Sequence, residues 1–356
     1  MSGSIRERTE AWEEDYLSPF ATASTKSHGR TRAEDDDPVR TCFQRDRDRI
    51  IHLCRAFRRL AHKTQVFFSP REDHLRTRLS HTLEVSQIGR TIAKALRLNE
   101  ELTEAIALAH DVGHTPFGHA GEEALDAAYR AADPSAHFRH NEHSLRVVDV
   151  LERDGAGLNL SAETREGIVT HSKGQRPTRE MLGDEVCSTI EAQVIRVSDR
   201  IAYLNHDLDD CTRLGVLDRG EVPKEVLRTL GERHSQRVGT MVLDLIEHSI
   251  DAPILDMSAD IGEATDALMA FMFARVYHSP GLDEERRKVA GVVAHLFDFY
   301  MHNDEALIEA AGQAPNETKE RARVVCDYVA GMTDRFARTQ YLKHFLPTGF
   351  PSFERA

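Results

Sequence analysis

Thirteen residues in the first half of the chain bring together side chains that bind metals and move protons. The stretch is His110-Asp111-Val112-Gly113-His114-Thr115-Pro116-Phe117-Gly118-His119-Ala120-Gly121-Glu122. Imidazoles and carboxylates are ligands for divalent metals, and they are the groups used most often for proton transfer near neutral pH. The stretch therefore predicts a metal or acid/base site, which residues elsewhere in the chain must complete.

A second polar stripe follows on a predicted helix further along the chain. Its members recur every three or four positions and so share one helix face: Asp199, Tyr203, Asp207 and Asp210. An ordinary solvated helix face would give the same pattern. However, three carboxylates on one face repel one another unless nearby cations neutralise their charge. A metal held by Asp199, with a polar ligand beyond it, is the functional interpretation.

A locally basic segment precedes both features. Spacings of three and four between apolar residues over 40–63 predict an amphipathic helix. Its end carries Arg55, Arg58, Arg59, His62 and Lys63. A solvated charged face is one interpretation of this cluster, and a neighbourhood that supplies cations to a phosphate-bearing substrate is the other.

Helical periodicity accounts for the elements that must position these residues. The segment 79–98 has one broad apolar face and carries His81, and Asn99 is a good N-cap for a helix that ends at His110. Pro116 and Gly118 predict a turn before the helix 120–132. Further helices are predicted over 141–151, 161–171, 190–214, 221–230, 236–250, 258–276, 283–311 and 316–345. Because period-two stretches of β-branched residues are missing, the sequence predicts an all-α fold.

Composition narrows the class of protein. The chain has 356 residues, 40% of them hydrophobic and 29% charged, which is typical of soluble globular proteins. No apolar run approaches the ~20 residues needed to span a bilayer, and the charged first twenty residues are unlike a signal peptide, so we expect a cytoplasmic protein. The five scattered cysteines predict reduced thiols. A net charge of -13 argues against a general nucleic-acid-binding surface.

The candidate groups define a mixed nitrogen and oxygen site. Such a ligand set suits a divalent ion, whether manganese, magnesium, iron, cobalt or zinc, without selecting among them. His119 and Glu122 lie three positions apart, and a carboxylate that orients an imidazole commonly prepares it as an acid or base. The HD dipeptide alone is a weak signal, whereas the full stretch with residues before and after it is specific.

In its motifs the chain resembles the HD-domain deoxynucleoside-triphosphate triphosphohydrolases, above all bacterial deoxyguanosinetriphosphate triphosphohydrolase-like proteins. The resemblance rests on Leu17-Ser18-Pro19, Phe57-Arg58-Arg59-Leu60, Arg78-Leu79-Ser80-His81, the stretch from His110 to Glu122, His140-Asn141-Glu142 and the run from Asp199 to Asp210. It implies an all-α HD-domain helical bundle with additional C-terminal helices. We expect a polar N-terminal arm over 1–40, an HD phosphohydrolase core over 41–250 and a C-terminal helical region over 251–356.

The resemblance also implies a reaction and a set of roles. Water would attack the α-phosphorus of a deoxynucleoside triphosphate (dNTP) and release a deoxynucleoside and triphosphate. The implied metal ligands are His81, His110, Asp111 and Asp199. The implied catalytic residues are His119 with Glu122, and His114 at the phosphates. The implied substrate-binding residues are Arg78 and Arg200 for phosphate, Tyr203 and Asp207 for the sugar, and Arg59 for phosphate or another part of the substrate.

Several points stay open at this stage. Members of the family form ring-like or higher homo-oligomers, including hexamers, and some respond to a dNTP activator. The alternatives are an HD phosphohydrolase acting on another phosphoester, and a non-catalytic nucleotide sensor or single-stranded nucleic-acid binder. His143 stands where the family pattern has glutamine, which leaves the role of the His140 motif undecided. Base preference and the identity of the metal are likewise undecided.

Overall fold

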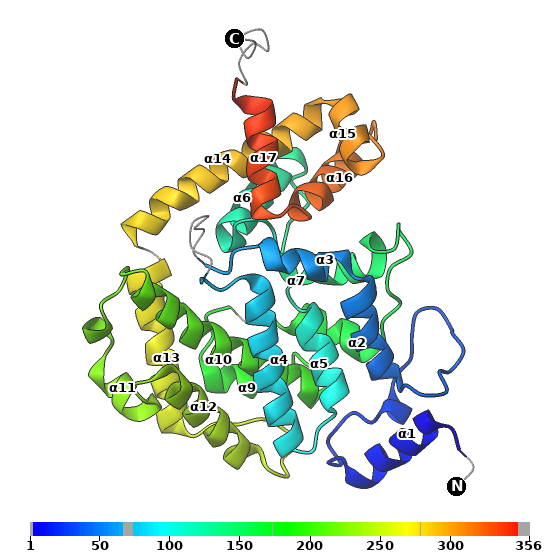
Figure 1. The fold of residues 1–356 in the computed structure, drawn as a ribbon, viewed down its shortest axis with the longest axis vertical. Helices are drawn as coiled ribbons and strands as arrows, with labels where there is room; N and C mark the ends of the chain where they lie inside the picture. Colours follow the sequence, from blue (N-terminus) through cyan, green and yellow to red (C-terminus); the bar gives the residue numbers. More distant parts are fainter. Residues whose placement is uncertain (1–2, 67–73, 173, 278, 348–356) are drawn as a thin grey trace, which may run out of the picture.

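A computed structural model describes residues 3–66, 74–172, 174–277 and 279–347, and all regular elements in these ranges are helical. Extended backbone pairs there only as isolated bridges, between Arg30 and Ser161 and between Thr64 and Thr77. The prediction of an all-α fold is confirmed (Figure 1). No described helix combines the length and the apolar character needed to cross a membrane.

The described helices follow one another along the chain in this order. The first half contains α1 (Ile5–Tyr16), η1 (Ser24–Lys26), α2 (Cys42–Leu53), α3 (Arg55–Arg59), η2 (Leu60–His62), α4 (Arg78–Ala95), α5 (Glu100–Ala109), α6 (Gly118–Ala132), α7 (His140–Arg146), η3 (Val147–Leu151) and α8 (Ala162–Thr170). The second half contains α9 (Thr178–Leu182), α10 (Ile190–Arg213), η4 (Arg219–Glu221), α11 (Lys224–Leu230), α12 (His234–Ser249), α13 (Ala259–Met272), η5 (Phe273–Tyr277), α14 (Pro280–His302), α15 (Asp304–Ala311), α16 (Thr318–Ala330) and α17 (Asp334–Phe345).

Three helices that the sequence predicted as continuous are each broken. The breaks fall at Cys54 in 40–63, at Asn303 in 283–311 and before Thr333 in 316–345. At each break the side chain accepts a hydrogen bond from a backbone N–H in the first turn of the next helix. These residues act as N-caps, and such caps stop one helix and start another without interrupting the apolar periodicity.

The buried hydrophobic residues of the described chain form three clusters, and two of them mark an upper and a lower helical body, while the third lies around α2, α3 and the end of α5. In Figure 1 the upper body contains α14 to α17, and these C-terminal helices pack around α6 through residues such as Leu125 and Leu296. The lower body contains α4, α5 and α10, and α13 joins it through Leu268 and Met272. Since α5 belongs to the lower body and α6 to the upper, the loop between them crosses from one core to the other.

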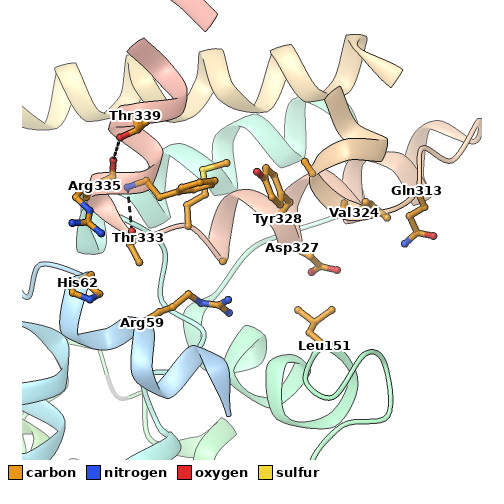
Figure 2. Close-up of a pocket in the computed structure, with 15 residues that line it drawn as sticks. Arg59, His62, Leu151, Gln313, Val324, Asp327, Tyr328, Thr333, Arg335 and Thr339 are labelled. Atoms are coloured by element: carbon orange, nitrogen blue, oxygen red, sulfur yellow. Dashed lines mark hydrogen bonds between the residues drawn. The ribbon is translucent and has the colours of Figure 1, made fainter. Parts of the chain in front are cut away.

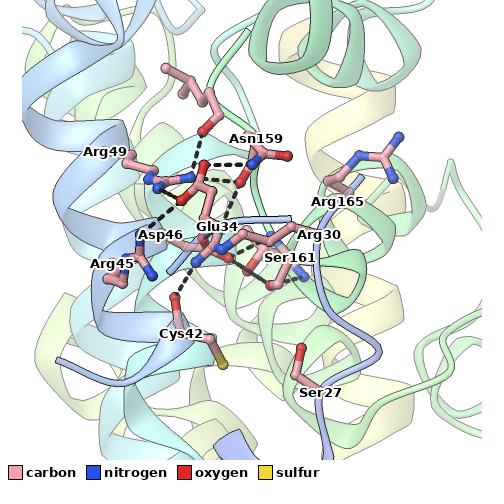
Figure 3. A network of polar contacts seen from close by, with 12 residues as sticks. Ser27, Arg30, Glu34, Cys42, Arg45, Asp46, Arg49, Asn159, Ser161 and Arg165 are labelled. Carbon is pink, nitrogen blue, oxygen red and sulfur yellow. Dashed lines mark hydrogen bonds and ion pairs between the residues drawn. The ribbon is translucent and has the colours of Figure 1, made fainter. Parts of the chain in front are cut away.

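The N-terminal arm is anchored to the lower body by charged side chains. Arg30 donates hydrogen bonds to the Asp46 carboxylate (2.5 Å) and to the carbonyl of Asn159 (2.6 Å). Asp46 in turn accepts from both the backbone N–H and the hydroxyl of Ser161. Glu34 accepts from the Asn159 amide at 2.6 Å (Figure 3). Residues 30–34 therefore clamp the start of α2 to the loop before α8.

The loop between α5 and α6 is held by the C-terminal helices. Asp334 accepts hydrogen bonds from the backbone N–H of Thr64 and of Phe117, both at 2.8 Å. The buried Lys63 ammonium group donates to the carbonyls of His114 and Ala330. Burial lowers the pKa of Lys63 to about 7. Phe117 has the left-handed backbone that L-residues rarely adopt (φ 63°), so these bonds hold a strained turn.

We predict that Asp334→Ala lowers the free energy of unfolding by about 2 to 4 kcal/mol. The variant leaves two backbone N–H groups without their acceptor, and each such buried loss costs about 1 to 3 kcal/mol. Urea denaturation measures the change. Asp334→Asn is the matched control, because its remaining side-chain oxygen keeps one of the two bonds, and it should lose less. Equal stability of Asp334→Ala and the unsubstituted protein would contradict the proposed clamp.

Candidate active site

Three of the predicted metal ligands converge from three different helices. His81 lies in α4, His110 follows the last residue of α5, and Asp199 lies in α10, with one ligand atom from each within 4.8 Å of the others. His81 Nε2 is 3.2 Å from Asp199 Oδ1. Because His110 Nδ1 lies 2.6 Å from the carbonyl of Ala107, that nitrogen carries the hydrogen and Nε2 presents a lone pair.

The donors of this cluster fit a divalent metal ion. His110 Nε2 is buried and has no hydrogen-bond partner among the described residues. Burial lowers the pKa of His81, with Asp199 opposing it, so the imidazole is neutral and able to ligate. Two imidazoles and a carboxylate form the mixed donor set that Mn, Fe, Co, Mg and Zn sites use. The cluster therefore brings together the donor atoms of a divalent-metal site.

Asp111, the fourth predicted ligand, is paired with an arginine. Its Oδ2 accepts from Arg78 Nη1 at 2.6 Å, and both side chains are buried. Its Oδ1 lies 3.7 Å from His110 Nε2. Burial raises the pKa of Asp111, but the Arg78 guanidinium more than offsets this and holds it well below the ordinary range. Arg78 keeps Nε and Nη2 buried without a described partner, so two donors remain for a ligand.

A second group of side chains lies at the start of α6 and α7. Glu122 accepts from the backbone N–H of His140, and its Oε1 is also 2.8 Å from His140 Nδ1. Its Oε2 lies 3.3 Å from Nδ1 of His119, whose side chain is 66% exposed. Burial raises the pKa of Glu122, and the facing histidines outweigh it, so the carboxyl is ionised. A charged carboxylate therefore orients an accessible imidazole, as the spacing of His119 and Glu122 predicts.

His114 lies between the two groups. Its ring stacks on that of His140, with centroids 4.2 Å apart, and its Nε2 is 3.9 Å from Asp111 Oδ1. Burial and the Arg78 charge hold the pKa of His114 well below its ordinary value. His114 is therefore a neutral imidazole, and its buried Nδ1 has no described partner.

The acidic stripe of α10 is not a solvated face. Asp207 and Asp210 are 3% and 4% exposed. Arg76 forms an ion pair with Asp210, with its Nη1 2.6 Å from Oδ1. Tyr277 donates a hydrogen bond to Asp207 Oδ2 at 2.5 Å. Asp210 therefore has a cationic partner and Asp207 has a hydrogen-bond donor, which offsets the repulsion between the carboxylates of this stripe. Arg200, predicted to bind phosphate, donates to Thr178 Oγ1 at 3.0 Å and is buried.

Three residues near the site were missed by the sequence analysis. Tyr277 contacts Asp207, and His206 lies between Asp207 Oδ1 (2.7 Å) and His81 Nδ1 (2.8 Å), so it orients a predicted metal ligand. His171, at the end of α8, points Nε2 toward His140. His206 lies within the run from Asp199 to Asp210 but was given no role, and neither Tyr277 nor His171 belongs to a local motif. The available signal for His171 was its place at a helix end, the same place as His110.

Arg59 faces a cavity and not the clustered histidines. It lines a cavity of 660 Å³ between α3 and the helices α16 and α17, together with His62, Tyr328 and Arg335 (Figure 2). The described residues that line this cavity include none of the clustered histidines. A contact between Arg59 and phosphate therefore stays a prediction.

His143, which stands where the family pattern has glutamine, has different neighbours from His140. His143 is buried, with its Nδ1 3.7 Å from Asp327 of α16, while His140 one turn earlier faces Glu122. The two histidines of this motif thus point to different partners. His143 joins α7 to the C-terminal helices, and His140 belongs to the site.

We predict that His143 makes the protein sensitive to acid. Burial lowers the pKa of His143 from 6.5 to about 3. Between these values the unfolded chain takes up a proton that the folded chain does not, so stability falls as pH falls, by up to about 1.4 kcal/mol per pH unit. His143→Asn should flatten this dependence, which urea denaturation at several pH values between about 6.5 and 4 measures. An unchanged slope in the variant would contradict the prediction.

Comparison with known proteins covers the whole chain. Residues 78–204 match the model of the HD domain, and residues 255–343 match that of the phosphohydrolase-associated domain. A deoxyguanosinetriphosphate triphosphohydrolase-like protein of Caldanaerobacter subterraneus subsp. tengcongensis is 50% identical, over 99% of this chain and 98% of the relative. Proteins of the same description from Desulfatibacillum aliphaticivorans (49%; 97% and 99% covered) and Clostridium perfringens (42%; 96% and 98%) are also similar.

Proposed function

Because the chain belongs to the HD-domain family of deoxyguanosinetriphosphate triphosphohydrolase-like proteins, we propose that it hydrolyses dNTPs to deoxynucleoside and triphosphate in a metal-dependent reaction. Family membership alone makes it a phosphohydrolase. One observation supports the finer proposal. Along α10, Tyr203 and Asp207 follow Asp199 by one and two turns, so a metal-bound phosphate and a sugar hydroxyl could belong to one substrate.

The proposed metal site uses His81, His110, Asp111 and Asp199. A divalent ion bound there would polarise the phosphoryl group and lower the pKa of a bound water. Arg78 supports the same end of the substrate, because its two unpartnered donors can bind phosphate oxygens in a fork. His114 adds a neutral imidazole beside Asp111, and Arg200 is proposed to contact the phosphates from α10.

The proposed reaction breaks the bond between the α-phosphorus and the 5′ oxygen of the sugar. A water oxygen becomes bonded to the α-phosphorus and loses a proton to solvent. The departing 5′ oxygen takes up a proton from His119, and solvent returns a proton to that imidazole. Glu122 holds the His119 ring in orientation through Nδ1. Tyr203 is proposed to crowd a 2′-hydroxyl, and Asp207, positioned by Tyr277, to accept a hydrogen bond from the 3′-hydroxyl.

A product-resolved assay tests this proposal. The protein is incubated with manganese and each dNTP, alone and mixed, and products are separated by ion-exchange chromatography. The expected products are triphosphate and deoxynucleoside, with ribonucleoside triphosphates turned over far more slowly. Release of orthophosphate or a nucleoside monophosphate would overturn the proposal in favour of another phosphoester substrate. Binding without turnover would favour a nucleotide sensor.

Faster turnover of the mixture would indicate an activating dNTP. Light scattering would give the oligomeric state.

A further inference from the structure

The cavity between α3 and the C-terminal helices α16 and α17 is large enough to bind a small molecule. Its volume of 660 Å³ falls within the range of about 300 to 1,000 Å³ that ligand sites occupy. Arg59 extends into the cavity from α3, and Arg335 lines it from α17 (Figure 2). Arg59 Nε is buried without a hydrogen-bond partner among the described residues. Neither guanidinium group forms an ion pair with a carboxylate in the described part of the chain, so both are available to a ligand.

The charge of this cavity is positive, although the chain as a whole carries a net charge of -13. Asp327 is the acidic member of the described lining, and its charge is already matched by Arg146 at 2.7 Å and Arg323 at 3.0 Å. Burial lowers the pKa of Arg59, and the Glu152 carboxylate only partly offsets this effect. A partly buried cation without a counterion destabilises the fold. An anion bound by both guanidinium groups would remove this destabilisation.

The cavity also has an apolar, partly aromatic surface. The side chains that form it belong to Leu151, Val324, Tyr328, Met332 and Phe336. Aromatic side chains pack favourably on flat apolar groups, and Phe336 is still 41% exposed. We propose that the cavity binds an organic phosphate monoester with a flat apolar body. Its phosphate has a charge of about -1.5 to -2 at pH 7, which matches two guanidinium groups that bind phosphate oxygens in a fork.

The cavity adjoins the contacts that join the C-terminal helices to the segment after α3. Its lining residues 331–333 lie between Ala330 and Asp334. Ala330 accepts a hydrogen bond from the Lys63 ammonium group, and Asp334 accepts one from the backbone N–H of Thr64. Lys63 and Thr64 directly follow the lining residues of the opposite wall. A ligand that contacts both walls therefore holds together the two segments that these bonds connect.

The same bonds extend to the turn before α6. The Lys63 ammonium group also donates to the carbonyl of His114, and the Asp334 carboxylate also accepts from the N–H of Phe117. His114 faces the candidate active site from this turn. A ligand in the cavity is therefore expected to stabilise the turn that positions His114, although it touches none of the clustered histidines.

Binding of 1-naphthyl phosphate to the full-length protein tests the proposal. Metal is first removed with a chelator and dialysis, so that the result does not depend on the proposed reaction. Isothermal titration calorimetry measures the affinity for 1-naphthyl phosphate and, separately, for inorganic phosphate. The unsubstituted protein should bind 1-naphthyl phosphate about 10-fold or more tightly than inorganic phosphate, because only the ester buries an apolar ring. Arg59→Gln and Arg335→Gln should each weaken this binding by about 10-fold or more.

Arg58→Gln is the matched control. Arg58 is an exposed arginine of the same helix that donates to the carbonyl of His52 and does not line the cavity. This variant should bind 1-naphthyl phosphate as the unsubstituted protein does, and equal weakening in it would overturn the proposal. Weakening in Arg59→Gln alone, with normal binding by Arg335→Gln, would also overturn it and place Arg59 in the substrate site. No binding by the unsubstituted protein, or equal affinity for inorganic phosphate, would do the same. Because Arg335 is exposed, its variant should fold, which circular dichroism checks.

Hydrogen–deuterium exchange tests the effect on the turn. Saturating 1-naphthyl phosphate should slow exchange of the Thr64 and Phe117 amides by about 3-fold or more in the unsubstituted protein, because their bonds to Asp334 open less often. Arg335→Gln at the same ligand concentration should show a smaller effect. Tight binding with unchanged exchange at both amides would overturn the proposed stabilisation of the turn.

Discussion

Asp199→Asn is expected to lower turnover by at least about 1000-fold and to weaken Mn²⁺ binding by at least 10-fold. Asp199 Oδ1 lies 3.2 Å from His81 Nε2, and His110 completes the cluster. An amide keeps the shape of the carboxylate but loses its charge and its strength as a ligand for a hard cation. A loss of several kcal/mol in transition-state stabilisation corresponds to this fall in rate.

The matched control is Asp209→Asn, on the same helix but outside the site. Asp209 pairs with Arg76 at 3.0 Å and is partly exposed, so its loss should leave metal binding intact. Turnover with each dNTP and equilibrium dialysis against Mn²⁺ measure the two effects in parallel. Full turnover by Asp199→Asn at low Mn²⁺ would rule out the assigned ligands.

His119→Ala is expected to lower turnover by about 10² to 10⁴-fold while leaving metal binding unchanged. General acid/base catalysis by one side chain contributes this much. Since the His119 side chain is 66% exposed, its removal should leave stability within about 0.5 kcal/mol. Glu122→Gln should also lose turnover, because the charge that orients both His119 and His140 is gone.

His137→Ala is the control for His119→Ala. His137 is a partly exposed histidine near the start of α7 that contacts a different carboxylate, Glu142, at 2.7 Å. Its loss should change neither turnover nor metal content. Turnover of His119→Ala equal to that of the unsubstituted protein would remove His119 from the reaction and leave Glu122 with His140 as the remaining candidate pair.

Local sequence patterns predicted most of the helices and many of their ends, but neither α1 nor α9. Asn99 and Ser161 cap α5 and α8 through side-chain hydrogen bonds, as polar residues before apolar periodicity indicate. The breaks at Cys54 and Asn303 were missed, because the apolar spacing continues across both. Tertiary packing decides whether a capping residue inside a periodic stretch ends one helix and begins another. The sequence pattern alone does not show which capping residues do so.

The candidate site shows the same limit. The cluster of His81, His110 and Asp199 was predicted because these residues stand in recognisable motifs. His171 and Tyr277 were missed because tertiary packing places them. His171 reaches the site because α8 packs against α5 and α10, and Tyr277 because η5, which packs on α13, brings it to Asp207 of α10. The role of the buried Lys63 was also missed. Its basic neighbours indicated a cationic surface, whereas its ammonium group donates to the carbonyls of His114, in the turn before α6, and of Ala330, at the end of α16.

Arg78 and its neighbours also affect the stability of the folded chain, besides their proposed contacts with the substrate. Two of its donors, together with His110 Nε2 and His114 Nδ1, are buried without partners among the described residues. A buried polar group without a partner lowers stability, so the fold is less stable around these atoms than it could be. A ligand that meets these atoms binds the folded chain alone and must raise its melting temperature. Thermal unfolding can therefore serve as a substrate screen that needs no knowledge of the reaction.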